Sequence, residues 1–289
     1  MSSIVAFLKA RGVQPNRRLG QNFLVDEGTS RRIAQASGAS PEARVVEIGP
    51  GAGSLTLPLL ELAGRVTVIE KDRTLTPLLR ERVAGVGELT LLEADALTVD
   101  YLQLAETLGG PLTLAANLPY NISTPILLHL LEQRRAFQSM TLMFQKEVAT
   151  RLTAPPGGKE YGILSVYCAC WTLPRRVMTL PPGAFYPAPQ VDSAVVRFDI
   201  LAEPPFPMTD ESLFRQVVRA AFAQRRKTLG NALSALADDA RARLLAAGID
   251  PMRRAETLSA AEFAHLARSW QEAALGENPD GFFGGGRVV

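Results

Sequence analysis

Short apolar runs alternate with amphipathic stretches along the first half of the chain. The runs have the length of buried strands, and the stretches between them repeat apolar residues with helical spacing. This alternation predicts an α/β fold with a mostly parallel seven-stranded sheet covered by helices. The predicted strands are residues 44–48, 65–70, 89–92, 112–116, 140–145, 163–171 and 194–199, and the predicted helices are residues 55–62, 73–83, 97–108 and 125–132.

The second half of the chain has a different pattern. Segments rich in proline and glycine, residues 154–159 and 181–189, join the later strands and favour antiparallel additions at one edge of the sheet. After a proline-rich stretch, residues 211–272 show helical spacing and no candidate strand. We therefore expect three parts: a catalytic domain over 1–203, a small all-helical domain over 204–275, and a flexible glycine-rich tail over 276–289.

A single polar residue follows each of the first four apolar runs. These residues are Glu47, Glu70, Asp95 and Asn117, at intervals of 23, 25 and 22 positions. Ligands of open α/β sheets bind at the carboxyl ends of the strands. Polar groups spaced one strand–helix unit apart are therefore expected to converge on one pocket.

The first of these residues opens the glycine-rich segment Glu47-Ile48-Gly49-Pro50-Gly51-Ala52-Gly53. Glycines let the backbone turn tightly and approach a ligand. The dinucleotide fingerprint requires a small apolar residue at position 54, where this chain has Ser54. An acidic pocket suits the cations of S-adenosylmethionine better than a pyrophosphate. Glu70 would bind a ribose diol and Asp95 an adenine amine, although Asp95 also fits a helix N-cap.

The tetrad Asn117-Leu118-Pro119-Tyr120 carries the sharpest chemical signal. Pro119 pushes Leu118 toward extended geometry, which can turn the Leu118 carbonyl out beside the Asn117 side-chain oxygen. Two acceptors then face one amino group and favour a pyramidal adenine N6 whose lone pair points at a methyl donor. Tyr120 would stack on the base. In isolation, an ordinary Asn-x-Pro turn explains the tetrad equally well.

A base inside folded nucleic acid must be turned outward to reach such a pocket. Phe185, on the proline-rich loop 181–189, is the candidate for a second aromatic wall. The alternative is that Phe185 and Tyr186 pin this loop to the core.

Composition limits the remaining possibilities. The chain has 289 residues, 47% of them hydrophobic, and a net charge of +2, which is too mild to imply nucleic acid by itself. Cys168 and Cys170 predict a reduced core and a cytoplasmic protein, and two histidines offer little for a metal site. No apolar run approaches the roughly 18 residues of a membrane helix.

These motifs resemble the ribosomal RNA adenine N6,N6-dimethyltransferases, specifically the small-subunit enzymes, over about residues 17–273. The resemblance implies a Rossmann-like methyltransferase domain and S-adenosylmethionine as cofactor. It also implies a substrate of two adjacent adenosines near the 3′ end of small-subunit ribosomal RNA, within a partly assembled subunit. The implied cofactor residues are Gln21, Asn22, Leu24, Gly49, Gly51, Glu70, Asp95 and Asn117; the implied catalytic residues are Asn117, Leu118, Pro119, Tyr120 and Phe185.

A basic run in the C-terminal part also matches this family. Residues 215–227 include five basic side chains and no acidic one, so Arg225, Arg226 and Lys227 are candidate RNA contacts. The alternative is a solvated helix face. Gln190 departs from the lysine that is common in the family, which removes one backbone contact from the expectation.

Four alternatives remain open at this point. A large-subunit methyltransferase of the macrolide-resistance type shares the tetrad, whereas a DNA adenine methyltransferase usually has proline at the position of Leu118. A ribosome assembly factor would need only the basic surface. A nicotinamide oxidoreductase is disfavoured by Ser54. The resemblance favours a monomeric small-subunit enzyme.

Overall fold

The computed structural model describes residues 4–16 and 19–276. The chain divides into two compact units. The first comprises residues 1–153 and 171–202, and the second comprises residues 154–170 and 203–289.

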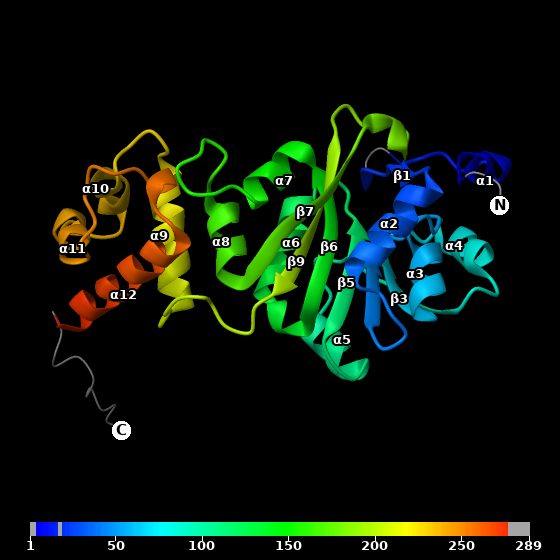
Figure 1. Cartoon of the computed structure of the whole chain (residues 1–289), viewed down its shortest axis with the longest axis horizontal. Helices are drawn as coiled ribbons and strands as arrows, with labels where there is room; N and C mark the ends of the chain where they lie inside the picture. The colour runs from blue at the N-terminus through cyan, green and yellow to red at the C-terminus, as the bar shows by residue number, and fades with distance from the viewer. Residues whose placement is uncertain (1–3, 17–18, 277–289) are drawn as a thin grey trace, which may run out of the picture. The chain divides into compact units, whose positions relative to one another are not determined.

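A seven-stranded sheet forms the centre of the first unit, in the order β4-β3-β2-β5-β6-β9-β7 (Figure 1). The five strands from β4 to β6 are parallel, and β9 runs antiparallel to both β6 and β7. The mostly parallel sheet with antiparallel additions at one edge is confirmed. The strands are β2 Arg44–Ile48, β3 Arg65–Glu70, β4 Glu88–Glu93, β5 Leu112–Asn117, β6 Phe137–Gln145, β7 Thr172–Leu180 and β9 Ser193–Ile200.

Helices connect the parallel strands, and α2 and α3 lie side by side against the sheet (Figure 1). Leucines of α3 and valines of β2 and β3 form the buried core between these layers. The helices of this unit are α1 Ile4–Ala10, α2 Glu27–Ser37, α3 Thr56–Ala63, α4 Thr76–Val83, α5 Tyr101–Thr107, α6 Ser123–Glu132 and α7 Lys146–Leu152, with 3-10 turns η2 Arg134–Ala136 and η3 Pro182–Ala184.

Two helices of this unit, α2 and α7, were absent from the sequence expectation. Helix α2 has clear end signals: the Asp26 side chain accepts from the Thr29 N–H at 2.7 Å, and Gly38 ends the helix in the left-handed region. An N-cap aspartate and a C-terminal glycine are readable in a sequence. The polar composition of the intervening residues concealed the helix.

The predicted strand at residues 163–171 is wrong. This segment is helix α8, Ile163–Trp171, and the strand β7 follows it. A short, uniformly apolar run fits a buried helix as well as a buried strand, because it has no alternation to separate them. Strand β7 contains Pro174, which lacks the N–H that a central strand needs, and it lies at the edge of the sheet, where proline is tolerated.

The second unit is helical, and its described residues include no strand, as predicted. Residues 154–170 belong to it, unlike the predicted boundary. The rings of Tyr161 and Tyr167 in this segment pack 6.2 and 6.4 Å from those of Phe222 and Phe214 in α9. Its remaining elements are α9 Glu211–Ala223, α10 Leu229–Ala232, η4 Leu233–Ala235, α11 Ala240–Ala246, η5 Ala255–Thr257 and α12 Ala260–Gly276. The predicted tail lies outside the described residues, except for Gly276.

The two cysteines test how deeply α8 is buried. Both thiols are fully buried, and burial raises the pKa of Cys168 to about 12. We expect neither thiol to react with a disulfide reagent in the native protein, and both to react in denaturant, because the thiolate is the reactive form. Ellman titration with and without guanidinium measures this, and rapid labelling of either native thiol would contradict the buried helix.

Candidate active site

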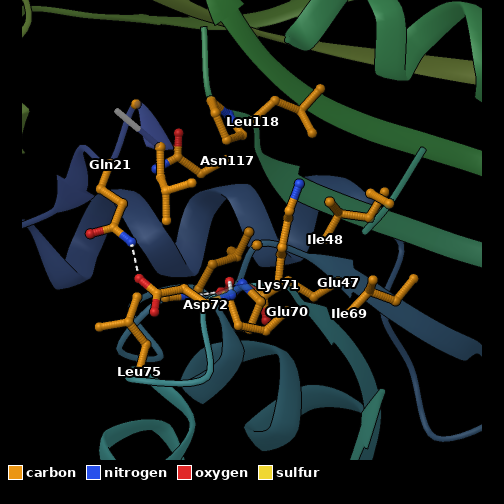
Figure 2. Close-up of a pocket in the computed structure, with 18 of the residues that line it drawn as sticks. Gln21, Glu47, Ile48, Ile69, Glu70, Lys71, Asp72, Leu75, Asn117 and Leu118 are labelled. Atoms are coloured by element: carbon orange, nitrogen blue, oxygen red, sulfur yellow. Dashed lines mark hydrogen bonds between the residues drawn. The ribbon is translucent and has the colours of Figure 1, made fainter. Parts of the chain in front are cut away.

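A pocket of about 960 Å³, including its open mouth, lies at the carboxyl ends of the parallel strands (Figure 2). The residues that line it include Leu19–Leu24 near the N-terminus, the glycine-rich turn after β2, the residues at and just beyond the ends of β3 and β4, and Asn117, Leu118 and Pro119 of the tetrad. Its acidic lining residues are Glu47, Glu70, Asp72 and Asp95. The predicted convergence of the strand ends is therefore observed.

The register of the sheet aligns three of these positions. Ile48 of β2 pairs with Ile69 of β3 and with Ala116 of β5. The next residue on each strand is Gly49, Glu70 or Asn117, so these three lie in a row across the sheet edge. Glu47 lies in β2, two positions before Gly49, and also lines the pocket.

Gly51 allows the turn to approach its neighbours. Its φ is +57°, and a Cβ added there would come within 2.8 Å of the Phe23 ring. Its N–H donates to Glu70 Oε2 at 3.1 Å, while the Asp72 N–H donates to Glu70 Oε1 at 2.7 Å. Burial raises the pKa of Glu70, and these two N–H groups oppose that rise. The Glu70 carboxylate is thereby fixed in the pocket.

Glu47 is the buried acid of the pocket. Its side chain is 1% exposed, and Oε2 has no hydrogen-bond partner among the described residues. Burial raises the pKa of Glu47 to about 8; the Thr56 side chain opposes this rise and the Glu70 carboxylate adds to it. A buried acceptor without a partner is costly, and a cationic ligand beside it would remove that cost. The residues present therefore suit the ammonium and sulfonium groups of S-adenosylmethionine.

Asp95 lines the pocket, but it is not the N-cap that the sequence also suggested, because α5 begins at Tyr101 and Asp100 caps it. Its Oδ1 accepts from the Leu97 N–H at 3.0 Å within a turn, while Oδ2 accepts from Lys71 Nζ at 2.7 Å. The hydrogen bond from the Lys71 ammonium contributes most to lowering the pKa of Asp95, and the hydrogen bond from the Leu97 N–H contributes next. Lys71 also lines the pocket, and no sequence pattern pointed to this lysine.

We call the N-terminal segment Leu19–Leu24 the strap. Gln21 Nε2 donates to Asp72 Oδ2 at 2.7 Å (dashed line in Figure 2), and Gln21 Oε1 accepts from the Asn16 N–H at 2.8 Å. The Leu24 carbonyl accepts from Ser54 Oγ at 2.9 Å. Polar contacts thus hold the strap to the end of β3 and to the glycine-rich turn.

The strap also pairs with the proline-rich loop. Strand β1, Phe23–Leu24, runs antiparallel to β8, Phe185–Tyr186, with Leu24 opposite Phe185. Residues of the strap and of the proline-rich loop were each predicted to belong to the site, but separately. Their pairing joins residues more than 160 positions apart, and short-range patterns carry no information about such a contact.

This pairing changes the interpretation of Phe185. The side chain is 4% exposed, belongs to the buried core cluster with Leu24, and does not line the pocket. The prediction of an open aromatic wall is not met in this structure, because β8 directs the ring into the core. The alternative, in which Phe185 pins the loop, describes the observed contacts.

Asn117, Leu118 and Pro119 of the tetrad line the pocket, whereas Tyr120 does not. Figure 2 shows Asn117 and Leu118 across the pocket from Glu70. Asn117 ends β5 and donates from Nδ2 to the Asn22 carbonyl at 2.8 Å. Leu118 is buried, and Pro119 lines the pocket. The Tyr120 hydroxyl makes a short hydrogen bond with Ser193 Oγ. Burial raises the pKa of Tyr120, and the hydrogen bond to Ser193 opposes that rise.

The predicted RNA-contact residues lie in the turn after α9, in the second unit. Arg225 Nη2 donates to the carbonyls of Lys159 and Tyr161, at 2.6 and 3.2 Å, so this side chain holds a loop of its own unit. Arg226 and Lys227 are exposed, and neither forms an ion pair within the described part of the chain.

Within residues 4–16 and 19–276, no helix combines the length and the hydrophobicity that spanning a membrane requires. The same residues hold no group of three or more His, Cys, Asp and Glu side chains that could bind a metal ion.

Comparison with known proteins agrees with the geometry of the site. The chain is 56% identical to ribosomal RNA small subunit methyltransferase A of Magnetococcus marinus, over 92% of this chain and 95% of that protein. It is 47% identical to the protein of the same name from Geobacter sulfurreducens, over 90% and 97%.

Two solved structures share the fold. A dimethyladenosine transferase from Plasmodium falciparum superposes with a TM-score of 0.71 at 24% identity, over 87% of this chain and 98% of that one. The 23S rRNA methyltransferase ErmE superposes with a TM-score of 0.66 at 26% identity, over 86% and 100%. Residues 12–272 match the family described as ribosomal RNA adenine dimethylase. The chain therefore belongs to the ribosomal RNA adenine dimethylase family.

Proposed function

We propose that the protein dimethylates N6 of two adjacent adenosines near the 3′ end of small-subunit ribosomal RNA, using S-adenosylmethionine. The observation that supports this most directly is the placement of Asn117. It stands on the rim of an acidic pocket with its amide nitrogen bound to the Asn22 carbonyl, which leaves its oxygen for a substrate amine.

Different residues of the pocket hold different parts of the cofactor. Glu70 accepts from the ribose hydroxyls and Asp95 from the adenine amine, while Glu47 faces a cationic group. Gly49 and Gly51 give the backbone room, and the strap residues Gln21, Asn22 and Leu24 cover the methionine end. S-adenosylmethionine supplies an electrophilic methyl group on its sulfonium centre.

The tetrad activates the target base by positioning it. The Asn117 Oδ1 and Leu118 carbonyl oxygens accept the two N6 hydrogens, Pro119 keeps the turn extended, and Tyr120 stacks on the ring. The N6 lone pair then points toward the methyl donor, and the proton leaves after attack, so no strong general base is required. The rate enhancement then comes from the alignment of N6 with the methyl group and from acceptor groups that are already oriented toward the amine. Stacking by Phe185 would require its ring to leave the core.

The choice of the small subunit rests on the relatives. Identity reaches 56% to a protein named for the small subunit and 26% to the large-subunit enzyme ErmE. The substrate is the RNA within a partly assembled 30S subunit, the enzyme acts as a cytoplasmic monomer, and Arg226 and Lys227 contact phosphates. A role as an assembly factor is compatible with methylation, because binding needs only the basic surface.

An Asn117→Ala variant tests the catalytic assignment. Because Asn117 supplies one of two acceptors for N6, we expect methyl transfer to unmodified small subunits to fall by roughly a hundredfold or more. Binding of the cofactor and of RNA should persist. Mass spectrometry of nucleosides measures dimethyladenosine directly. Turnover at the wild-type rate would remove the tetrad from the mechanism, and product only in large-subunit RNA would overturn the substrate.

The Glu47 carboxyl makes cofactor binding depend on pH. With a pKa of about 8 it is protonated at neutral pH in the free protein. A bound cation lowers that pKa, so binding releases a proton, and affinity rises with pH until it levels off above pH 8. Calorimetry in two buffers of different ionisation enthalpy measures the release. The isosteric Glu47→Gln variant should show none, and a wild-type enthalpy that is independent of buffer would exclude the assignment.

Substitution of the exposed residues Arg226 and Lys227 tests the proposed RNA-binding surface. Replacing both by alanine should weaken RNA binding and reduce the slope of log affinity against log salt by about 1 to 2. Replacing Arg241, an exposed basic residue of α11 in the same unit, serves as the control. If the salt dependence of the double variant equals that of the wild type, Arg226 and Lys227 do not contact the RNA. Arg225 is left intact because its carbonyl contacts stabilise the unit.

A further inference from the structure

The orientation of the Asn117 amide is set by the strap and not by the turn that carries the tetrad. A main-chain carbonyl can only accept, so the atom of Asn117 that faces the Asn22 carbonyl at 2.8 Å must be the amide nitrogen. The oxygen is then directed elsewhere, and it accepts no hydrogen bond from the described residues. This assignment follows from chemistry and needs no hydrogen positions.

The same strap covers the cofactor pocket. Every residue from Leu19 to Leu24 lines it. The strap is also braced internally, since Asn22 Nδ2 donates to the Gly20 carbonyl at 3.0 Å. A movement that opens the pocket along this side therefore also moves the carbonyl that holds Asn117.

Gly20 fits the strap closely against the tetrad. A Cβ added at Gly20 would lie 3.3 Å from Pro119 Cβ and 2.8 Å from Asn121 Oδ1. The exposed Asn121 side chain can swing away, whereas the proline ring is rigid. Glycine at position 20 thus permits the contact that brings the Asn22 carbonyl within hydrogen-bonding distance of Asn117.

We propose that the Asn22 carbonyl, seated by Gly20, is a positioning group that makes the Asn117 oxygen available to the target base only when the strap is closed over the cofactor pocket. This inference rests on the proposed function of Asn117. Closure of one half of the site then prepares the other half. Each cofactor carries one methyl group, so dimethylation requires an exchange, and opening the strap for that exchange releases the amide from its fixed orientation.

The substitution Asn117→Asp tests the proposal, because an ionised aspartate has no hydrogen to donate. A carboxylate facing the Asn22 carbonyl is repelled, and only its protonated form restores the hydrogen bond. We therefore expect the pKa of the aspartate at position 117 to lie above its ordinary value of about 3.9. The variant's single-turnover rate, relative to wild type, should fall as pH rises through that pKa.

Asn121→Asp is the matched control. It places the same charge in the same turn, on an exposed side chain whose oxygen lies beside Gly20. Carboxyl carbon NMR with S-adenosylhomocysteine bound measures both pKa values without any turnover. Rates are then measured on unmodified small subunits across the same pH range.

The outcomes separate the alternatives. A raised pKa and an acid-favoured rate in Asn117→Asp, with neither in Asn121→Asp, support the proposal. An ordinary pKa at position 117, or a rate that is constant or rises with pH, overturns it, since a free carboxylate would be the better acceptor for N6. The NMR measurement does not depend on methyl transfer. If the wild-type protein fails to methylate this RNA, the proposed function is wrong, but the pKa at position 117 still tests the role of the Asn22 carbonyl.

A glycine pair tests the role of strap closure. Gly20→Ala and Gly12→Ala both add a side chain at a positive φ, +65° and +67°, but an added Cβ at Gly12 meets nothing within 4 Å. We expect Gly20→Ala to shift the Asn117 side-chain amide resonance toward its solvent-exposed position and to slow single-turnover transfer by roughly threefold to thirtyfold. Gly12→Ala should do neither. Equal behaviour of the two variants would refute the seating role of Gly20.

Discussion

The register of the parallel strands is the constraint on which the site depends. Ile48, Ile69 and Ala116 are paired across β2, β3 and β5. Because successive side chains of a strand point to opposite faces, a slip of one residue would move each polar group at the strand ends to the wrong side. The buried valines and leucines beneath these positions oppose such a slip. The hydrophobic core therefore fixes the chemistry at the edge of the sheet as well as the stability of the fold.

The strap completes a site that the sheet alone leaves open. Parallel strands deliver Glu70 and Asn117 to the same edge, but the groups that bind Asn117 Nδ2 and Asp72 Oδ2 come from outside the sheet. The strap adds these groups from a segment that precedes the first strand of the sheet, and β1–β8 pairing ties it to the proline-rich loop. Segments outside the parallel units thus decide how the groups at the strand ends are oriented.

Local patterns explain why so much of this molecule was predictable. Strand ends, the glycine-rich turn and the tetrad lie in short segments whose spacing places them on one edge of a parallel sheet. Helix α8 was mistaken for a strand because Ile163–Trp171 is apolar apart from Ser165. The contacts of Phe185, Lys71 and Arg225 could not be predicted, since each depends on a partner that only the folded chain brings near.

The free energies of the hydrogen bonds indicate how firmly the strap holds the Asn117 amide. A single neutral hydrogen bond contributes about 1 kcal/mol net, which biases an amide flip by roughly fivefold. The strap is also held by the bond from Gln21 to the Asp72 carboxylate, and hydrogen bonds to charged groups are worth about 1.5–3 kcal/mol. Because the Asp72 contact and the Asn22 carbonyl move with the same short segment, the charged bond reinforces the neutral one. The hydrogen bond to the Asn22 carbonyl alone would only favour this orientation of the Asn117 amide. Together with the Gln21–Asp72 bond, it maintains the orientation while the strap remains closed.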